Sequence, residues 1–266
     1  MTSFCYGGNI QANGIRQHYL RYGGRGQPLL LIPGITSPAI TWGFVAEELA
    51  RTHDVYVLDV RGRGLSESGP ELAYDFDSYA LDASAFIEAM SLEDCIIVGH
   101  SMGARIAARL TRLSSIKIAK IVLVDPPVSG PGRREYPSKI DWYVDSIRHS
   151  LRGMTGEEMR PYLPTWTEEQ LRLRAEWLHT CSEQAVVETY ERMHTEDFHP
   201  DVPHLSAPTL LLVATRAGVI LPEDEAELVK LSTKIVVRRI DAGHMIPWDN
   251  LKDFLAAVTP FIGGRD

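Results

Sequence analysis

The stretch VGHSMGAR, residues 98–105, carries the most informative pattern in this chain. Ser101 stands between two glycines, after the apolar run CIIV and before the helix-forming run ARIAARLTRL. A strand that turns at once into a helix leaves no room for Cβ atoms, and Gly99 and Gly103 remove that crowding. The turn also strains the backbone of Ser101 and lifts its hydroxyl clear of the sheet. We predict that Ser101 is a nucleophile; the alternative is a simple tight turn.

Short apolar runs alternate with helical patterns on both sides of this stretch. This βαβ rhythm predicts a mostly parallel sheet with right-handed crossovers and flanking helices, which is an α/β fold. An Asn-Gly pair at 13–14 predicts a hairpin turn before the first strand. The strands are expected at 15–23, 28–34, 54–60, 95–101, 118–126, 207–215 and 234–240, and the helices at 41–52, 78–90, 102–113, 223–231 and 249–262.

The connection between the strands ending near Asp125 and beginning at Ala207 is unusually long. A parallel crossover needs only about a dozen residues, and helical runs such as DWYVDSIRHSL and TEEQLRLRAEWLHTC occupy the excess. We therefore predict a core formed by residues 1–126 and 207–266, with an inserted helical cap at 127–206.

Composition narrows the class of protein. The 266 residues carry a net charge of −8 and 44% hydrophobic residues, without a block of Lys or Arg, which disfavours nucleic acid and membrane as partners. The three cysteines are far apart and form no CxxC pair, which is typical of a reducing compartment. No signal peptide pattern or apolar run of membrane-spanning length is apparent. We expect a soluble cytoplasmic protein; oligomeric state is not indicated.

A nucleophilic serine needs a histidine base and an acid that orients it. In the chain order Ser, acid, His, the single histidine after the last predicted strand is His244, in the loop before the final helix. The strand at 207–215 ends in TRAGVI and offers no carboxylate until Glu223 and Asp224, in the first turn of a helix. Asp125 ends the preceding strand directly. We predict Asp125 as the acid, with Asp224 as the alternative.

The oxyanion formed during acyl transfer needs two backbone amide donors. One should be the amide of Met102, the residue after the nucleophile. The other should come from the loop after PLLLIPG, where Gly34 allows a sharp turn. This makes the amide of Ile35 the natural second donor, with Thr36 behind it.

Two other patterns have simpler explanations. Gly62 and Gly64 resemble half a phosphate loop, but the Lys-Ser/Thr signature is missing, so a glycine turn after a strand is predicted. His194, His199 and His204 lie near two acids, but a spacing of five does not share a helical face, and prolines interrupt the segment. We therefore predict no metal site there.

The strand–GHSMG–helix unit, the Pro-Gly loop, DVRGRG and the terminal GHMIPW together resemble the α/β-hydrolase superfamily over essentially the whole chain. The segments PGITSPAITWGFVAE, LVDPPVSGPGRREYPSK, DWYVDSIR, RAEWLHTC and GHMIPWD resemble its subgroup of deformylases that act on N-formylmaleamate in nicotinate degradation. This resemblance implies the triad Ser101, Asp125 and His244, in agreement with the acid chosen by position. It also implies that neither a metal nor an organic cofactor is needed.

The resemblance implies a small anionic amide substrate that yields maleamate and formate. A carboxylate favours an arginine partner. The predicted cap offers five, of which we select Arg174, together with Trp142, as substrate-binding residues; the candidates are Arg133, Arg134, Arg148, Arg172 and Arg174.

Three alternatives remain open at this point. A related amidase, such as one resembling (acetamidomethylene)succinate hydrolase, would release acetate. An enol-lactonase or carbon–carbon bond hydrolase would use a similar triad on small carboxylates. A non-catalytic ligand receptor on the same scaffold would have no need to retain the Ser, Asp and His together.

Overall fold

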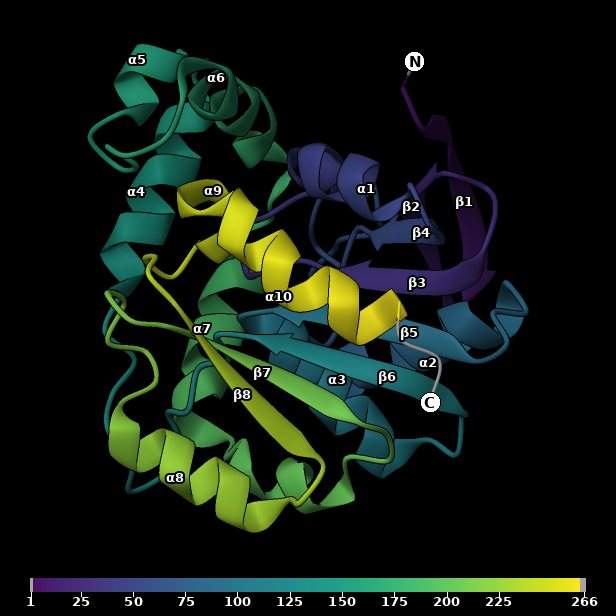
Figure 1. The fold of residues 1–266 in the computed structure, drawn as a ribbon. Coiled ribbons are helices and arrows are strands. Elements are labelled where there is room, and N and C mark those ends of the chain that lie inside the picture. The colour runs from purple at the N-terminus through teal and green to yellow at the C-terminus, as the bar shows by residue number, and fades with distance from the viewer. Residues whose placement is uncertain (1, 264–266) are drawn as a thin grey trace.

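The computed structural model describes residues 2–263, which form one eight-stranded sheet with helices on both faces (Figure 1). The strand order is β1-β2-β4-β3-β5-β6-β7-β8. The strands are β1 Phe4–Ala12, β2 Ile15–Tyr22, β3 Gln27–Ile32, β4 His53–Leu58, β5 Cys95–His100, β6 Ile118–Val124, β7 Thr209–Ala214 and β8 Ile235–Ile240.

The sheet is antiparallel at one edge and parallel elsewhere. β1 pairs with β2 and β2 with β4 in antiparallel register, whereas β4, β3, β5, β6, β7 and β8 are parallel neighbours. Asn13 and Gly14 join β1 to β2 with φ angles of 52° and 76°, as the hairpin prediction requires. β1 extends the sheet by a strand beyond the first one predicted.

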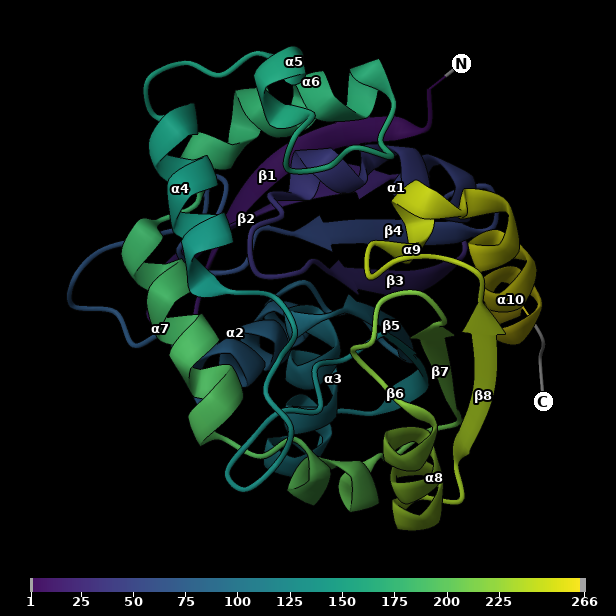
Figure 2. The ribbon, with the colours of Figure 1, turned by 90° about the vertical axis from the view of Figure 1, so that its left-hand side faces the viewer.

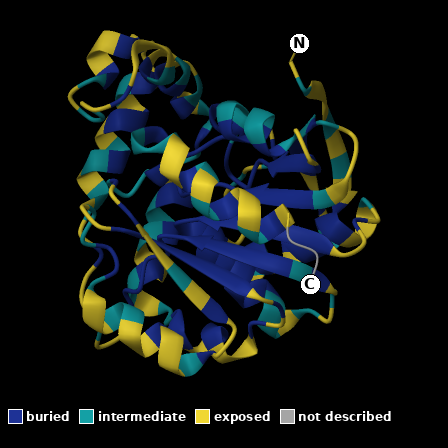
Figure 3. Ribbon diagram, viewed as in Figure 1, coloured by how far each residue is buried: buried dark blue, intermediate teal, exposed yellow. Residues whose placement is uncertain are grey.

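Helices cover both faces of the sheet. Figure 2 shows the sheet between α10 on one side and α2 and α3 on the other. The central strands β3, β5 and β6 are almost entirely buried (Figure 3), which explains their continuous apolar runs. The core helices, with one 3₁₀ turn, are η1 Ala39–Trp42, α1 Gly43–Leu49, α2 Phe76–Ala89, α3 Met102–Leu113, α8 Pro222–Leu231, α9 Ile246–Asp249 and α10 Leu251–Gly263.

The chain between β6 and β7 forms helices. Figure 1 shows α4, α5 and α6 gathered beyond one end of the sheet, while α7 lies closer to α2 and α3 in Figure 2. None of the helices within residues 2–263 has the length and apolar character needed to cross a membrane. The elements of this insertion are α4 Ile140–Ser150, α5 Gly156–Met159, α6 Glu168–Trp177, η2 Leu178–Thr180, α7 Glu183–Thr195 and η3 His199–His204.

Candidate active site

The turn between β5 and α3 has the strained geometry that its sequence predicts. Ser101 has φ 54° and ψ −116°, and its amide donates to the carbonyl of Val124 at 2.9 Å. A Cβ on Gly99 would lie 2.3 Å from the carbonyl oxygen of Gly103, and one on Gly103 would lie 2.0 Å from the carbonyl oxygen of Ile32. These are backbone atoms that cannot rotate away. Both glycines are therefore required by close backbone approach.

Gly103→Ala is expected to cost about 1–3 kcal/mol or more of the free energy of unfolding, because its methyl group would collide with the backbone of Ile32. Urea unfolding of the variant measures this cost. Gly69→Ala is the matched control, because a Cβ there meets nothing within 4 Å. Equal stability of the two variants would contradict the close approach that the structure shows.

Three side chains distant in sequence meet beside this turn. His244 Nε2 lies 2.9 Å from Ser101 Oγ, and His244 Nδ1 lies 2.7 Å from Asp125 Oδ2. A carboxylate only accepts hydrogen bonds, so Nδ1 carries a proton and Nε2 is free to accept the serine proton. Asp125 is fully buried, and its Oδ1 accepts from the amide of Ala214 at 3.1 Å. The arrangement fits a nucleophile, a base and an orienting acid.

The alternative acid has a different structural role. Asp224 lies in the first turn of α8, where its carboxylate accepts from the amide of Leu221 at 2.8 Å and from Arg134 Nη2 at 2.6 Å. It therefore caps a helix and forms an ion pair, whereas the imidazole of His244 faces Asp125. The geometry favours Asp125 over Asp224.

His100 supports the histidine loop, a role that the sequence did not suggest. Its Nε2 lies 2.9 Å from the carbonyl oxygen of His244. Burial, followed by the proximity of His244, lowers the pKa of His100 to about 3, so the ring stays neutral and Nε2–H donates to that carbonyl. The residue before the nucleophile thus holds the backbone of the base.

The turn at residues 34–37 lies beside Ser101. The amide of Ser37 donates to the carbonyl of Gly34 at 3.1 Å, and because the peptide is planar and trans, the amide of Ile35 points the opposite way. A Cβ on Gly34 would be 3.5 Å from that of Ser101, which shows how closely the two segments approach. Met102 begins α3, so its amide has no acceptor within the helix. The placement of Ile35 and Met102 fits the predicted pair of oxyanion donors.

Arg63, from the DVRGRG segment, anchors this turn from behind. It is 1% exposed, and its Nε donates to the carbonyl of Ile35 at 2.9 Å. Its remaining donors reach Arg61, Tyr79 and α7, including Thr189 Oγ1 at 2.8 Å. Only the structure revealed this role, because the sequence pattern indicated a turn and nothing more. Gly62 and Gly64 have φ angles of 77° and 59°, as a glycine turn requires.

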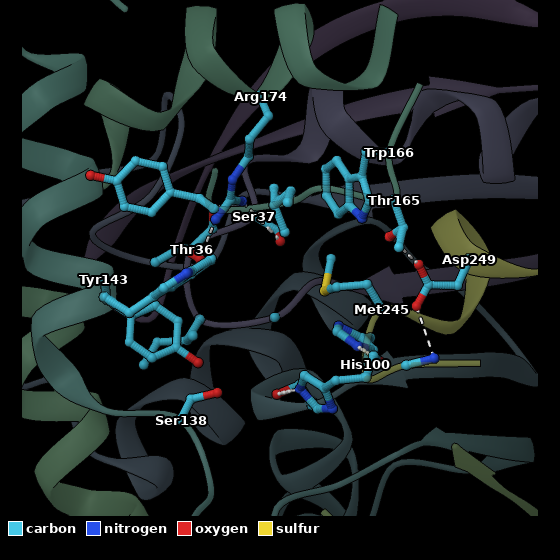
Figure 4. Close-up of a pocket in the computed structure, with 18 of the residues that line it drawn as sticks. Thr36, Ser37, His100, Ser138, Tyr143, Thr165, Trp166, Arg174, Met245 and Asp249 are labelled. Atoms are coloured by element: carbon cyan, nitrogen blue, oxygen red, sulfur yellow. Dashed lines mark hydrogen bonds between the residues drawn. The ribbon is translucent and has the colours of Figure 1, made fainter. Parts of the chain in front are cut away.

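A cavity of about 740 Å³ opens above Ser101 and His244. The insertion contributes its upper wall, including Trp142 and Arg174, the two residues selected from the sequence. Figure 4 shows Arg174 reaching down to Thr36 and Ser37, near Tyr143 and Trp166. This volume is within the range of small-molecule sites.

Arg174 differs from the other four arginines considered in that it is not paired with an acidic side chain of residues 2–263. It is 3% exposed, and its guanidinium donates to the carbonyl oxygen of Thr36, to Thr36 Oγ1 at 2.5 Å and to Ser37 Oγ at 3.5 Å. Within residues 2–263 it has no acidic partner, and its Nε has no hydrogen-bond acceptor. Burial lowers its pKa from the usual value. The other four pair with acids: Arg133 with Asp197 and Glu227, Arg134 with Asp224, Arg148 with Glu183, and Arg172 with Glu176.

Two of the three histidines in the 194–204 segment have hydrogen-bond partners in the protein. His194 Nδ1 lies 2.8 Å from the carbonyl oxygen of Tyr190, and His199 Nδ1 lies 2.8 Å from Asp197 Oδ1. A search of residues 2–263 for groups of three or more potential metal-ligating His, Cys, Asp or Glu side chains finds none.

Comparison with known proteins agrees with this geometry. The alpha/beta hydrolase family profile matches residues 29–258. The chain therefore belongs to the alpha/beta hydrolase family, as the fold and the strained turn at Ser101 predicted.

Two deformylases are similar to this chain over nearly its full length. An N-formylmaleamate deformylase of Pseudomonas putida is 57% identical over 263 residues, which cover 98% of each chain. The crystal structure of the N-formylmaleamic acid deformylase from Pseudomonas putida S16 matches with a TM-score of 0.92 and 55% identity, covering 96% of this chain and all of that one. E-2-(acetamidomethylene)succinate hydrolase has a TM-score of 0.78 at 21% identity, covering 98% of this chain and all of that one, and shows the fold alone.

Proposed function

We propose that this protein hydrolyses the N-formyl amide bond of N-formylmaleamate to give maleamate and formate. The main support is the 57% identity to a deformylase over nearly the full length of both chains. The chemistry is consistent with the hydrogen-bonded series from Ser101 through His244 to Asp125 at the floor of the cavity.

The first half of the reaction transfers the formyl group to the enzyme. Ser101 Oγ attacks the formyl carbon while His244 Nε2 takes the hydroxyl proton, and Asp125 stabilises the imidazolium that forms. The amides of Ile35 and Met102 would hold the oxyanion of the tetrahedral intermediate. The carbon–nitrogen bond then breaks, and His244 returns the proton to the nitrogen of maleamate. This nitrogen is already attached to a second carbonyl group, so it leaves more readily than a simple amine.

The second half releases formate. A water molecule takes the place of maleamate, and His244 removes its proton as it attacks the formyl–serine ester. The tetrahedral intermediate collapses as His244 returns this proton to Ser101 Oγ, which frees Ser101 and releases formic acid, and the acid ionises to formate. Every proton transfer uses His244 Nε2, so none of these steps requires a metal or redox group.

Arg174 would bind the carboxylate of the substrate, and Trp142 would pack against its carbon chain. A buried guanidinium without an acidic partner is costly, and a bound carboxylate would compensate its charge. The buried Nε–H of Arg174 has no hydrogen-bond acceptor in the described structure, so an acceptor brought by the substrate would satisfy it. We also propose that residues 127–206 act as the cap of this site, because the upper lining residues Trp142, Tyr162 and Arg174 belong to that segment.

Arg174→Ala is expected to raise KM for N-formylmaleamate by on the order of 10- to 100-fold, the worth of a charge-assisted hydrogen bond. Because Arg174 also holds Thr36, the informative quantity is the ratio of kcat/KM for this substrate to that for a neutral formyl ester. This ratio should fall at least about tenfold.

Arg172→Ala is the matched control, since Arg172 lies on the same helix and pairs with Glu176 at the surface. It should leave both substrates almost unaffected. Equal losses on both substrates in Arg174→Ala would restrict Arg174 to supporting the turn at Thr36.

Product analysis tests the proposed function directly. The purified protein should release formate and maleamate in equal amounts from freshly prepared N-formylmaleamate. Acetate from an N-acetyl analogue, without formate, would indicate a related amidase. Cleavage of an enol lactone or carbon–carbon bond alone would indicate a different hydrolase, and failure of Ser101 to react with any acylating reagent would indicate a receptor.

A further inference from the structure

Asp249 joins the histidine loop to the insertion. Its Oδ2 accepts from the amide of Gly243, the residue before His244, at 2.8 Å. Its Oδ1 accepts from Thr165 Oγ1, in the segment between α5 and α6, at 3.0 Å. Figure 4 shows Asp249 beside Thr165 at the edge of the cavity. One carboxylate therefore contacts two chain segments that are far apart in sequence.

A second contact lies next to this one. Trp166 stacks on Trp248 with ring centroids 5.1 Å apart and an interplanar angle of 15°. Both rings are buried, and Trp248 also packs edge-on against Trp42 at 4.7 Å and Phe44 at 5.0 Å. The insertion thus rests on the short helix α9, which begins two residues after His244.

Further ring contacts connect Trp42 with His244 through His100. Trp42 lies 5.4 Å from the ring of His100, and His100 lies 4.9 Å from the ring of His244. His100 also donates to the carbonyl of His244. The backbone of His244 is therefore held from both sides, by Asp249 at Gly243 and by His100 at its own carbonyl.

We propose that residues 162–166, the roof segment, dock on α9 and thereby position His244, with Asp249 and Thr165 as positioning residues. The inference rests on the role proposed for His244 as the base. Tyr162, Leu163 and Pro164 of the roof segment line the cavity, so docking both closes the cavity and completes the support of the base.

Two physical features allow the docking of the roof segment to affect the position of His244. Thr165 is exposed and Asp249 is half-buried, so their hydrogen bond can open without unfolding the core. The Trp166–Trp248 stack is buried and gives the docked state a large apolar contact. When the roof segment leaves, the carboxylate of Asp249 loses one of the two partners that fix its orientation toward Gly243.

The test measures the reactivity of Ser101 toward a small reagent that does not depend on substrate recognition. Phenylmethanesulfonyl fluoride forms a Ser101 Oγ–sulfur bond as fluoride leaves, and the serine proton passes to His244. The labelling rate therefore reports the position of the base. Thr165→Val should slow labelling roughly threefold to tenfold, and Asp249→Ala should slow it further. The double variant should resemble Asp249→Ala alone.

Two variants serve as controls. Asp249→Asn can keep both contacts, since its amide oxygen can accept from Gly243 and its NH₂ can donate to Thr165, so labelling should stay near the wild-type rate. Thr180→Val makes the same chemical change elsewhere in the insertion, where the hydroxyl donates only to the carbonyl of Trp177, and should have no effect. Melting temperatures confirm that each variant is folded.

A roof segment that positions His244 and one that only covers the cavity predict different changes in the labelling rate of Ser101. A roof segment that only covers the cavity would, on losing Thr165, leave labelling unchanged or accelerate it, and this result would overturn the positioning role while leaving the proposed function intact. Absence of labelling at Ser101 in the wild-type protein would overturn the proposed function together with this inference.

Discussion

Ser101→Ala is expected to lower the rate of formate release from N-formylmaleamate by on the order of 10⁶-fold. The substitution removes the proposed attacking atom, the hydroxyl oxygen 2.9 Å from His244 Nε2. A formate dehydrogenase-coupled assay measures the loss, and His244→Ala should produce a similar one. The two losses should not add, because the serine and the histidine act as one unit.

The fold of the Ser101→Ala protein should be unchanged, since the substitution removes one hydroxyl group, whose hydrogen bond is with His244. An unaltered melting temperature and retained binding of maleamate would show that the loss is chemical. A variant that kept a substantial fraction of the wild-type rate would contradict the nucleophilic role of Ser101.

Asp125→Asn is expected to reduce kcat by up to about 10⁴-fold, by analogy with other triads. The NH₂ group that replaces Oδ2 would donate toward His244 Nδ1. Because Nδ1 would then be the acceptor, the imidazole would adopt the tautomer in which Nε2 already carries a proton. Such a base cannot accept the proton of Ser101. Steady-state kinetics with N-formylmaleamate measure the effect.

Asp224→Asn is the matched control, because Asp224 is the other carboxylate that the sequence allowed. It caps α8 and pairs with Arg134, so its substitution should change kcat by no more than a few-fold and cost about 1 kcal/mol of stability. A nearly silent Asp125→Asn beside an inactive Asp224→Asn would reverse the assignment of the acid.

The candidate nucleophile Ser101 and the candidate base His244 could be proposed from the sequence because their signals are local. The glycines around Ser101 are needed by backbone atoms within a few residues of one another and by the adjacent strand β3. The spacing of strands and helices follows from hydrophobic periodicity, which also requires only nearby residues. Asp125 could be proposed as the acid because the parallel strand that it follows lies next to the strand of Ser101, so both residues lie at the same edge of the sheet.

The contacts made across the fold were not predictable in this way. Five arginines in the insertion have the same local character, and only folding shows that four meet carboxylates while Arg174 lines the cavity without a carboxylate partner among residues 2–263. Arg63 and His100 likewise acquire their roles from the carbonyl groups of Ile35 and His244, which a sequence pattern does not record.

The sequence alone therefore determined the α/β architecture, the strained turn at Ser101 and the order of the candidate catalytic side chains, because steric fit and periodicity act over short stretches of chain. The tertiary structure was needed to connect Asp249 with Thr165 and to identify which of the five arginines considered lines the cavity. These features depend on the packing of distant segments, where many residues of the same type compete for one partner and only their final positions distinguish them.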